Sequence, residues 1–442
     1  MTAAAPSTSS GQALSAYPEP GIRLGTAAVP LDTAFNRALA LGVGFLLAVL
    51  TLQTQYIGTP TDLLSRIAPV DMLCVVFIST LFVRHRMRPV PAPALLYAAA
   101  VVLALIPAVL ITPGFNPKVW AQFAGILMAF AFYVIGLNVG DSPALLRWLL
   151  AGLCAAVVGE AVIVYHDTFS SSLWFPDPMA NRVRGTFKTN GQLGAYAFCA
   201  AAFLVTFGAT VTAPRHRKIF AAAALLAASF VFFASRRMGM LAVFAWGALF
   251  AVLGARFTGR RFYNGFLAGL AGVVVLIAAY WPQIEGSFVG RRFRDAVDTV
   301  GKREGFIQDQ MSDCLRTASE WFPLGFGVGR GSRVDPNDFF EVHNGLLAVL
   351  VELGVLGFAG FVGMTLWPLI KRRWYARSFD HQRLGVLLTT TLLISVLFMF
   401  HNTLYRDRAF LLFLGVATAV VARESQKEGE KSDLFLTGRV DS

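Results

Sequence analysis

The sequence contains few charged residues for its length. Only 14% of its 442 residues are Asp, Glu, Lys or Arg, whereas 56% are hydrophobic. Soluble domains carry about 25% charged residues, so the composition argues against a soluble fold. The net charge is still +12, but the basic residues stand in short runs between apolar segments. That pattern is typical of membrane topology, and nucleic acid is therefore not an expected partner.

Several familiar sources of chemistry are also absent. The sequence has no Asp-x-Asp pair for a metal-bound nucleotide sugar, no Walker loop, no His/Cys metal spacing and no Gly-x-Ser-x-Gly elbow. Of four cysteines, Cys74, Cys154 and Cys199 lie in apolar runs, and Cys314 has no mate nearby. We therefore expect no disulfide framework, no metal and no cofactor.

Long apolar runs are abundant. Runs able to cross about 30 Å of hydrocarbon occur near 38–55, 67–83, 93–112, 119–138, 144–164, 191–211, 218–234, 239–255, 263–280, 344–366, 386–400 and 409–421. The sequence predicts an all-α polytopic membrane protein with about twelve transmembrane helices. Its expected parts are a disordered cytoplasmic tail (1–33), helices one to nine (34–280), a long external loop (281–342), helices ten to twelve (343–421) and a second cytoplasmic tail (422–442).

The basic residues orient this chain. Short loops on the N-terminal side hold fifteen Lys and Arg residues, against nine in short segments on the other side. Cytoplasmic loops retain Lys and Arg, so both termini are expected in the cytoplasm. Five of the nine external cations fall within 182–188 and 236–237. Cations beside hydrocarbon need a partner, and a lipid-linked phosphate or pyrophosphate is the expected one.

The long external loop has two distinctive stretches. The first has apolar residues at helical spacing from Ile307 to Phe322, which predicts an amphipathic helix. The second, Pro323 to Gly329, is rich in glycine. It does not link a strand to a helix, as a phosphate-binding loop would. We interpret it as a flexible connector.

Two pairs of external arginines are candidate phosphate ligands. Arg182 and Arg184 precede the sixth run, where helix N–H groups also favour anions. Arg236 and Arg237 join two runs with almost no loop, so both lie close to hydrocarbon. Guanidinium binds phosphate oxygens in a bidentate fork. One of this second pair is expected to bind phosphate and the other to extend to the head groups. Contact with lipid head groups alone is the alternative for the first pair.

Histidine and buried acids complete the set of candidates. His343-Asn344 begins the tenth run, and histidine can abstract a proton from a sugar hydroxyl, although a structural hydrogen bond is the commoner role. Asp71, Glu160 and Glu352 lie within apolar runs and should face the bundle interior. Pairing with an interior Arg is the leading interpretation, and a proton relay in a transporter is the alternative.

The order of these features resembles the superfamily of O-antigen ligases and Wzy-type polysaccharide polymerases. The shared features are about twelve spans, Arg-Gly-Thr-Phe before one span, Ser-Arg-x-x-Gly before another, a long external loop, and His-Asn opening a helix with Glu-Leu-Gly. The resemblance covers roughly 180–370, and the first five spans match in number and hydrophobicity alone. It implies a GT-C-like glycosyltransferase of the bacterial inner membrane that works at the periplasmic face.

The resemblance also implies a reaction. Without a metal, such an enzyme would move a glycan from undecaprenyl pyrophosphate to an acceptor sugar and invert the anomeric centre. The roles implied are pyrophosphate binding by Arg184 and Arg236 or Arg237, with Arg182 beside them; a general base, His343; and supporting residues Asn344, Glu352 and Asn190. Many relatives carry paired asparagines where this chain reads Lys188-Thr189-Asn190-Gly191, so the supporting role of Asn190 is the one on which this chain departs from the family pattern.

Three functions stay open at this point. A polymerase, whose acceptor is another lipid-linked repeat, is favoured slightly because it does not require a host with lipopolysaccharide. A polymerase would also be expected to work with a chain-length regulator. A ligase would use the lipid A core as acceptor. A transporter or flippase of lipid-linked sugars is the alternative of a different class, expected to show broken helices in paired halves.

Overall fold

The computed structural model describes most of the apolar part of the chain. The described ranges are 31–48, 69–84, 87–111, 117–169, 190–211, 214–233, 237–254, 322–328, 344–372, 379–399 and 404–437, with positions 174, 183, 185–187, 275, 279, 282, 312, 315, 316, 319 and 320. Regular structure within these residues is entirely helical. The predicted all-α class is therefore confirmed.

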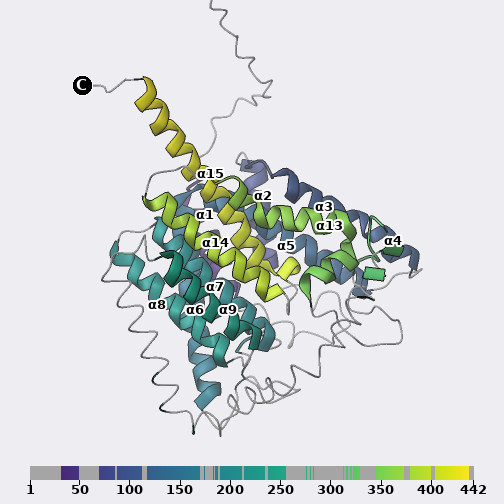
Figure 1. The fold of residues 1–442 in the computed structure, drawn as a ribbon, viewed down its shortest axis with the longest axis horizontal. Helices are drawn as coiled ribbons and strands as arrows, with labels where there is room; N and C mark the ends of the chain where they lie inside the picture. The colour runs from purple at the N-terminus through teal and green to yellow at the C-terminus, as the bar shows by residue number, and fades with distance from the viewer. Residues whose placement is uncertain are drawn as a thin grey trace, which may run out of the picture.

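The helices follow one another in an order close to that of the apolar runs (Figure 1). They are α1 (Ala34–Leu46), α2 (Pro69–Arg84), α3 (Ala92–Leu103), α4 (Leu105–Ile111), α5 (Pro117–Asp141), α6 (Pro143–Phe169), α7 (Asn190–Val211), α8 (Pro214–Phe233), α9 (Arg237–Gly254), α13 (Gly345–Ile370), α14 (Phe379–Met399), the 3-10 turn η3 (Leu404–Arg406) and α15 (Arg408–Thr437). They coincide with eleven predicted runs. The run at 263–280 lies almost wholly outside the described residues. Of the predicted amphipathic helix ending at Phe322, residues 312, 315, 316, 319 and 320 are described, and each of them is helical.

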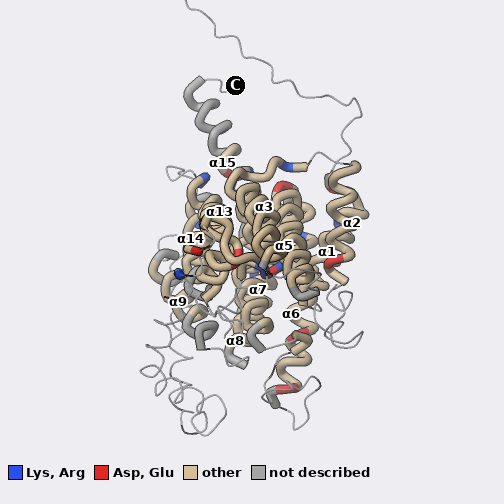
Figure 2. The backbone as a smooth tube through the Cα atoms, turned by 90° about the vertical axis from the view of Figure 1, so that its right-hand side faces the viewer, with Lys and Arg blue, Asp and Glu red and all other residues tan. Residues whose placement is uncertain are grey.

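Five helices among the described residues are long and apolar enough to cross a membrane. They cover Ala92–Leu110, Val119–Asp141, Pro143–Asp167, Gly345–Ile370 and Arg408–Gln426. Shorter apolar helices at Ala34–Leu46, Pro69–Val83, Gln192–Gly208 and Lys218–Val231 accompany them. Few charged residues interrupt the described backbone (Figure 2). The protein is thus a helical membrane protein, while a total of twelve crossings stays a prediction.

Short connections arrange neighbouring helices as antiparallel hairpins. A single residue, Ser142, separates α5 from α6, and residues 212–213 and 234–236 are all that separate α7, α8 and α9. Helix starts and ends therefore alternate between two ends of the bundle. Following the predicted orientation, we call the end at which α1 begins the cytoplasmic end and the opposite one the external end.

Polar contacts tie helices together at the cytoplasmic end. Arg88, between α2 and α3, pairs with Asp141 at the end of α5. From α15, Arg423 donates to the carbonyl oxygen of Gly140 at 2.8 Å. Helix α15 then continues to Thr437, so the beginning of the predicted polar tail is helical. Its last turns project beyond the other helices in Figure 1.

Glycines allow the closest helix pairs to approach. Gly136 and Gly415 lie between α5 and α15, and Gly44 and Gly152 lie between α1 and α6. A Cβ atom at any of the four would lie 2.1–2.4 Å from a carbonyl oxygen of the partner helix. Within a membrane, association depends on such close packing because lipid tails are as apolar as the helix surfaces.

Candidate functional site

Three of the predicted site residues stand at the starts of described helices. Arg182, Arg184, Arg236 and His343 lie outside the described residues. The backbone is described at three of their neighbours: Asn190 opens α7, Arg237 opens α9, and Asn344 precedes α13. The side chains of the first two lie outside the description.

Chain direction brings the starts of α7, α9 and α13 to the external end. The two starts at Asn190 and Arg237 share one end because α8 runs antiparallel between them. A hydrogen bond also ties α13 to this end. Glu352 of α13 accepts from Tyr405, which lies just before the start of α15. A helix start presents unpaired N–H groups and a partial positive charge, which favour phosphate.

Asn344 has a defined role at the start of α13. Its backbone is extended, with φ −95° and ψ 114°. The side-chain Oδ1 accepts hydrogen bonds from the N–H groups of Leu346 at 3.0 Å and Leu347 at 3.1 Å. This is an N-cap, which fixes where the helix begins.

The Gly-Thr-Phe part of the Arg-Gly-Thr-Phe motif is buried against α6. Glu160, only 2% exposed, accepts a hydrogen bond from the Thr186 N–H through Oε2 at 3.2 Å, and its Oε1 contacts the Thr186 hydroxyl. That hydroxyl also lies 2.8 Å from the carbonyl oxygen of Ala48. Phe187 packs on the ring of Tyr196, with centroids 5.0 Å apart. We call the contacts among Glu160, Thr186 and the Ala48 carbonyl the Glu160–Thr186 latch.

At Gly185, both the backbone conformation and the space available favour glycine. Its φ is +57°, in the left-handed region that favours glycine. A Cβ atom there would lie 2.4 Å from Oε2 of Glu160. Within the described residues, the hydrogen-bond partner of Glu160 is Thr186 and not the interior Arg that the sequence predicted. Sequence reasoning missed this contact because the two residues are 26 positions apart.

The expected pairing with Arg is confirmed for Asp71. Its two carboxylate oxygens accept from Nε and Nη2 of Arg408 at 2.6 and 2.8 Å. The pair joins the start of α2 to the start of α15, so Arg408 already has an anionic partner. Among the external cations, Arg406 donates to Oε1 of Gln122 at 3.0 Å. These two arginines tie the external end of the bundle together.

Glu352 lies next to an interruption in α13. Gly354 has φ 65° and ψ −168°, which divides the helix. Oε2 of Glu352 accepts from the Tyr405 hydroxyl at 2.7 Å, and the Tyr405 carbonyl accepts from Tyr97 at 2.7 Å. Both tyrosines are fully buried. The acid therefore belongs to a hydrogen-bonded cluster inside the bundle.

A second helix is interrupted nearby. Helices α3 and α4 are separated at Ala104, and Pro107 follows within the first turn of α4. Proline removes a backbone donor and clashes with the preceding turn, which accounts for the break. Helices α3 and α13 pack side by side (Figure 1), so the two interruptions are neighbours.

The glycine-rich stretch fills these interruptions. Phe326 N–H donates to the Val351 carbonyl at 2.6 Å, Gly327 N–H to the Glu352 carbonyl at 3.2 Å, and Val328 N–H to the Ala104 carbonyl at 3.3 Å. Backbone that is not helical is tolerated at membrane depth when protein groups satisfy it. We call residues 322–328 the inserted segment.

The prediction of a flexible connector is wrong for the inserted segment. Gly325 and Gly327 have φ of 74° and 103°. Cβ atoms on them would lie 2.4 Å from the Gly354 nitrogen and 2.6 Å from the Ala108 nitrogen. These glycines serve close backbone approach and a left-handed conformation. Glycine composition alone does not distinguish that role from flexibility.

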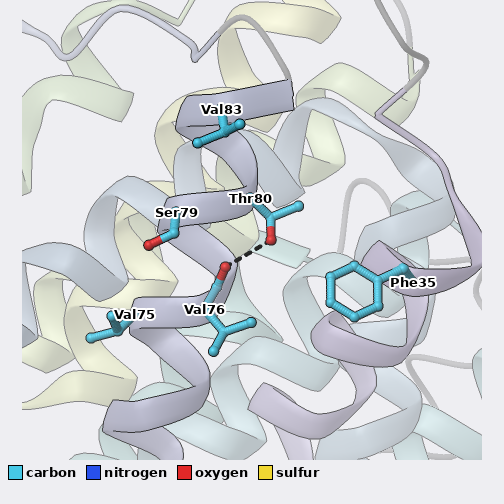
Figure 3. Close-up of a pocket in the computed structure, with 6 residues that line it drawn as sticks. All are labelled: Phe35, Val75, Val76, Ser79, Thr80 and Val83. Carbon is cyan, nitrogen blue, oxygen red and sulfur yellow. Dashed lines mark hydrogen bonds between the residues drawn. The ribbon is translucent and has the colours of Figure 1, made fainter.

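An open apolar groove lies away from the predicted site. It runs between α1 and α2 and is lined by Phe35, Val75, Val76, Ser79, Thr80 and Val83 (Figure 3). The Thr80 hydroxyl donates to the Val76 carbonyl at 2.8 Å, so it is satisfied within its own helix. Both Phe35 and Val83 stand at the cytoplasmic ends of their helices. The groove offers no charged group for phosphate chemistry.

Within the part of the chain that the structure describes, no three His, Cys, Asp or Glu side chains gather as a metal site. His343 is outside that part, so metal independence stays a prediction.

Comparison with known proteins adds no assignment. No protein-family model matches the sequence, and no curated protein matches it.

Proposed function

We propose that this chain transfers a glycan from an undecaprenyl-pyrophosphate donor to an acceptor sugar at the periplasmic face of a bacterial inner membrane. The observation that carries the proposal is the shared position of three helix starts. Helices α7, α9 and α13 begin at one end, next to Arg184, Arg236 and His343 in the sequence. The family resemblance supplies the reaction type.

Fixed cations provide the chemistry that such a donor needs. A pyrophosphate leaving group gains negative charge as the glycosidic bond breaks, and groups already aimed at it lower the barrier. Arg184 directly precedes the buried Gly185 and the latched Thr186. Helix α9 begins at Arg237, so its N-terminal N–H groups lie beside the Arg236-Arg237 pair in the sequence. We assign donor binding to Arg184 and one of Arg236 and Arg237.

His343 is the proposed general base. It would accept the proton of the acceptor hydroxyl while the opposite face of the sugar loses pyrophosphate, which inverts the anomeric centre. The Asn344 cap fixes the start of α13, the helix that follows His343 in the sequence. No metal takes part in the proposed step.

Replacement of Arg184 tests donor binding. Arg184→Ala should fail to restore the missing glycan in a deletion strain and should lose binding of undecaprenyl pyrophosphate by the purified protein. Arg184→Lys should restore little, since Lys cannot form the bidentate fork. Lys118→Ala, which removes an external cation at the start of α5, is the matched control. Full activity of Arg184→Ala with normal membrane insertion would remove this residue from the site.

Replacement of His343 tests the base. His343→Ala should lower kcat much more than it weakens undecaprenyl pyrophosphate binding, because a base acts in the transition state. Turnover can be measured with lipid-linked glycan extracted from the deletion strain. An equal loss of binding and turnover would contradict the base assignment.

The deletion strain also separates the two acceptors. Loss of glycan chain length identifies a polymerase, which is our leading form of the proposal. Accumulation of long, unattached lipid-linked chains identifies a ligase that uses the lipid A core.

One observation favours the transporter alternative. The interruptions of α3/α4 and α13 are the kind of feature that transporters use to bind ions and substrates. Purified protein in liposomes should move lipid-linked sugar between leaflets if this alternative holds. Transfer to an acceptor without such movement would exclude it.

A further inference from the structure

Glu160 is an acid in an apolar helix with a well-defined set of neighbours. It lies in α6, only 2% exposed, and within the described residues its hydrogen bonds join it to Thr186. An ionised carboxylate without a cation is costly at such a position. The hydrogen bonds of the latch therefore depend on the protonation state of Glu160.

The Thr186 hydroxyl cannot satisfy both of its oxygen neighbours when Glu160 is ionised. The Thr186 hydroxyl has one hydrogen but two oxygen neighbours, Oε1 of Glu160 and the Ala48 carbonyl at 2.8 Å. A carbonyl cannot donate, and an ionised carboxylate cannot donate either. With an ionised Glu160, both neighbours would need the same hydrogen, and one contact would lack a proton.

A neutral Glu160 satisfies these contacts and the one to the Thr186 N–H. Its carboxyl O–H donates through Oε1 to the Thr186 hydroxyl, which in turn donates to the Ala48 carbonyl. The Thr186 N–H donates to the other oxygen, Oε2, at 3.2 Å. Each donor then meets one acceptor.

We infer that Glu160 is held in its neutral form and acts, through Thr186, as a positioning residue for Arg184. The carboxyl packs against the left-handed turn at Gly185, where a Cβ atom would lie 2.4 Å from Oε2. On the other side of the latch, Phe187 packs on Tyr196. The backbone that carries Arg184 is thus anchored one and two residues away. The positioning role rests on the proposed donor-binding role of Arg184.

The test compares an isosteric with a truncated side chain. The Glu160→Gln amide can donate to the Thr186 hydroxyl and accept from its N–H, as the neutral acid does. We expect its donor KM to stay within about threefold of the wild type, because the hydrogen bonds are conserved. Glu160→Ala should raise the donor KM by about tenfold or more, because buried polar groups lose their partner. Gly159→Ala, whose Cβ would meet nothing within 4 Å, is the neighbouring control.

Replacement of Thr186 provides the matching pair of variants. Thr186→Ser retains the hydroxyl and should rescue donor KM, whereas Thr186→Val should resemble Glu160→Ala. Thr186→Val and Glu160→Ala should change the donor KM more than kcat, since His343 is untouched. A Glu160→Gln protein as defective as Glu160→Ala would overturn the neutral-acid inference, and it is the result expected of a proton relay.

A spectroscopic measurement keeps the inference separate from the proposed function. The infrared difference spectrum between wild type and Glu160→Gln, in detergent at neutral pH, should contain the C=O band of a protonated carboxylic acid. Loss of a carboxylate band instead would refute the neutral form. If Arg184→Ala retains full activity, the proposed function fails and the positioning role with it, but the infrared result still decides the protonation state.

Discussion

Replacing Gly354 by alanine should destabilise this protein severely. Its φ of 65° and ψ of −168° lie in a region that only glycine occupies without strain. An added Cβ would lie 2.0 Å from the Pro323 carbonyl oxygen and 2.5 Å from the Gly325 nitrogen. Both contacts are with backbone of the inserted segment, so no side chain can rotate away.

The expected cost has two parts. Forcing alanine into this backbone conformation costs about 1–3 kcal/mol. Overlap with the inserted segment adds about 1–3 kcal/mol if the neighbours shift as in other overpacked interiors. Together these amount to about 2–6 kcal/mol, a large part of the roughly 5–15 kcal/mol that stabilises a typical folded protein.

Two matched variants make the measurement specific. Gly125 in α5 and Gly159 in α6 are helical glycines at which a Cβ would meet nothing within 4 Å. Alanine at either position should leave stability unchanged or raise it by up to about 1 kcal/mol, because alanine favours helix. Unfolding in mixed micelles with increasing SDS gives the free energies. If Gly354→Ala unfolds together with the two controls, the inserted segment does not dock at the α13 interruption as described.

Three further predictions concern packing, charge and metal. Arg408→Gln should cost about 3–5 kcal/mol, because the buried Asp71 carboxylate loses its arginine partner. Asp71→Asn should cost less, because the Arg408 side chain is partly exposed. The double variant should cost less than the sum, and additive costs in the same SDS assay would show that the pair is not coupled. Gly136→Ala should separate α5 from α15 and lower the unfolding free energy by about 1–3 kcal/mol. Gly125→Ala in the same helix should not lower the unfolding free energy. Equal stabilities of the two variants would contradict the close approach of α5 and α15. Glycan transfer should be unaffected by EDTA, and EDTA-sensitive transfer that Mg²⁺ restores would refute the metal-free reaction.

The positions of the helices could be predicted from the sequence because length and apolar composition decide them. A run such as 119–138 must be helical in hydrocarbon, where every backbone group needs an internal partner. Helix α1 falls on the first predicted run, and its start is capped by Thr33. Asp71 also followed the expectation, since a buried acid in lipid is usually paired.

The contacts that shape the external end could not be predicted in this way. Gly354 looks like an ordinary packing glycine, and its conformation depends on a segment about thirty residues earlier in the chain. Pro107 was a visible signal for the break between α3 and α4, but nothing local indicates what would fill it. Glu160 and Thr186 are likewise distant in sequence. Such contacts depend on tertiary packing, and the spacing of apolar residues along the sequence does not predict it.

The filled interruptions bear on the choice between a transporter and a transferase. In a transporter, broken helices turn backbone groups towards an ion or substrate. Here the Val351, Glu352 and Ala104 carbonyls accept hydrogen bonds from the inserted segment, so the protein's own backbone occupies that place. Moving a substrate through this point would require the inserted segment to leave and three buried carbonyls to lose their partners. A transferase working at the external end needs no such movement, and it gains a fixed anchor between the external segment and α13, the helix that follows His343.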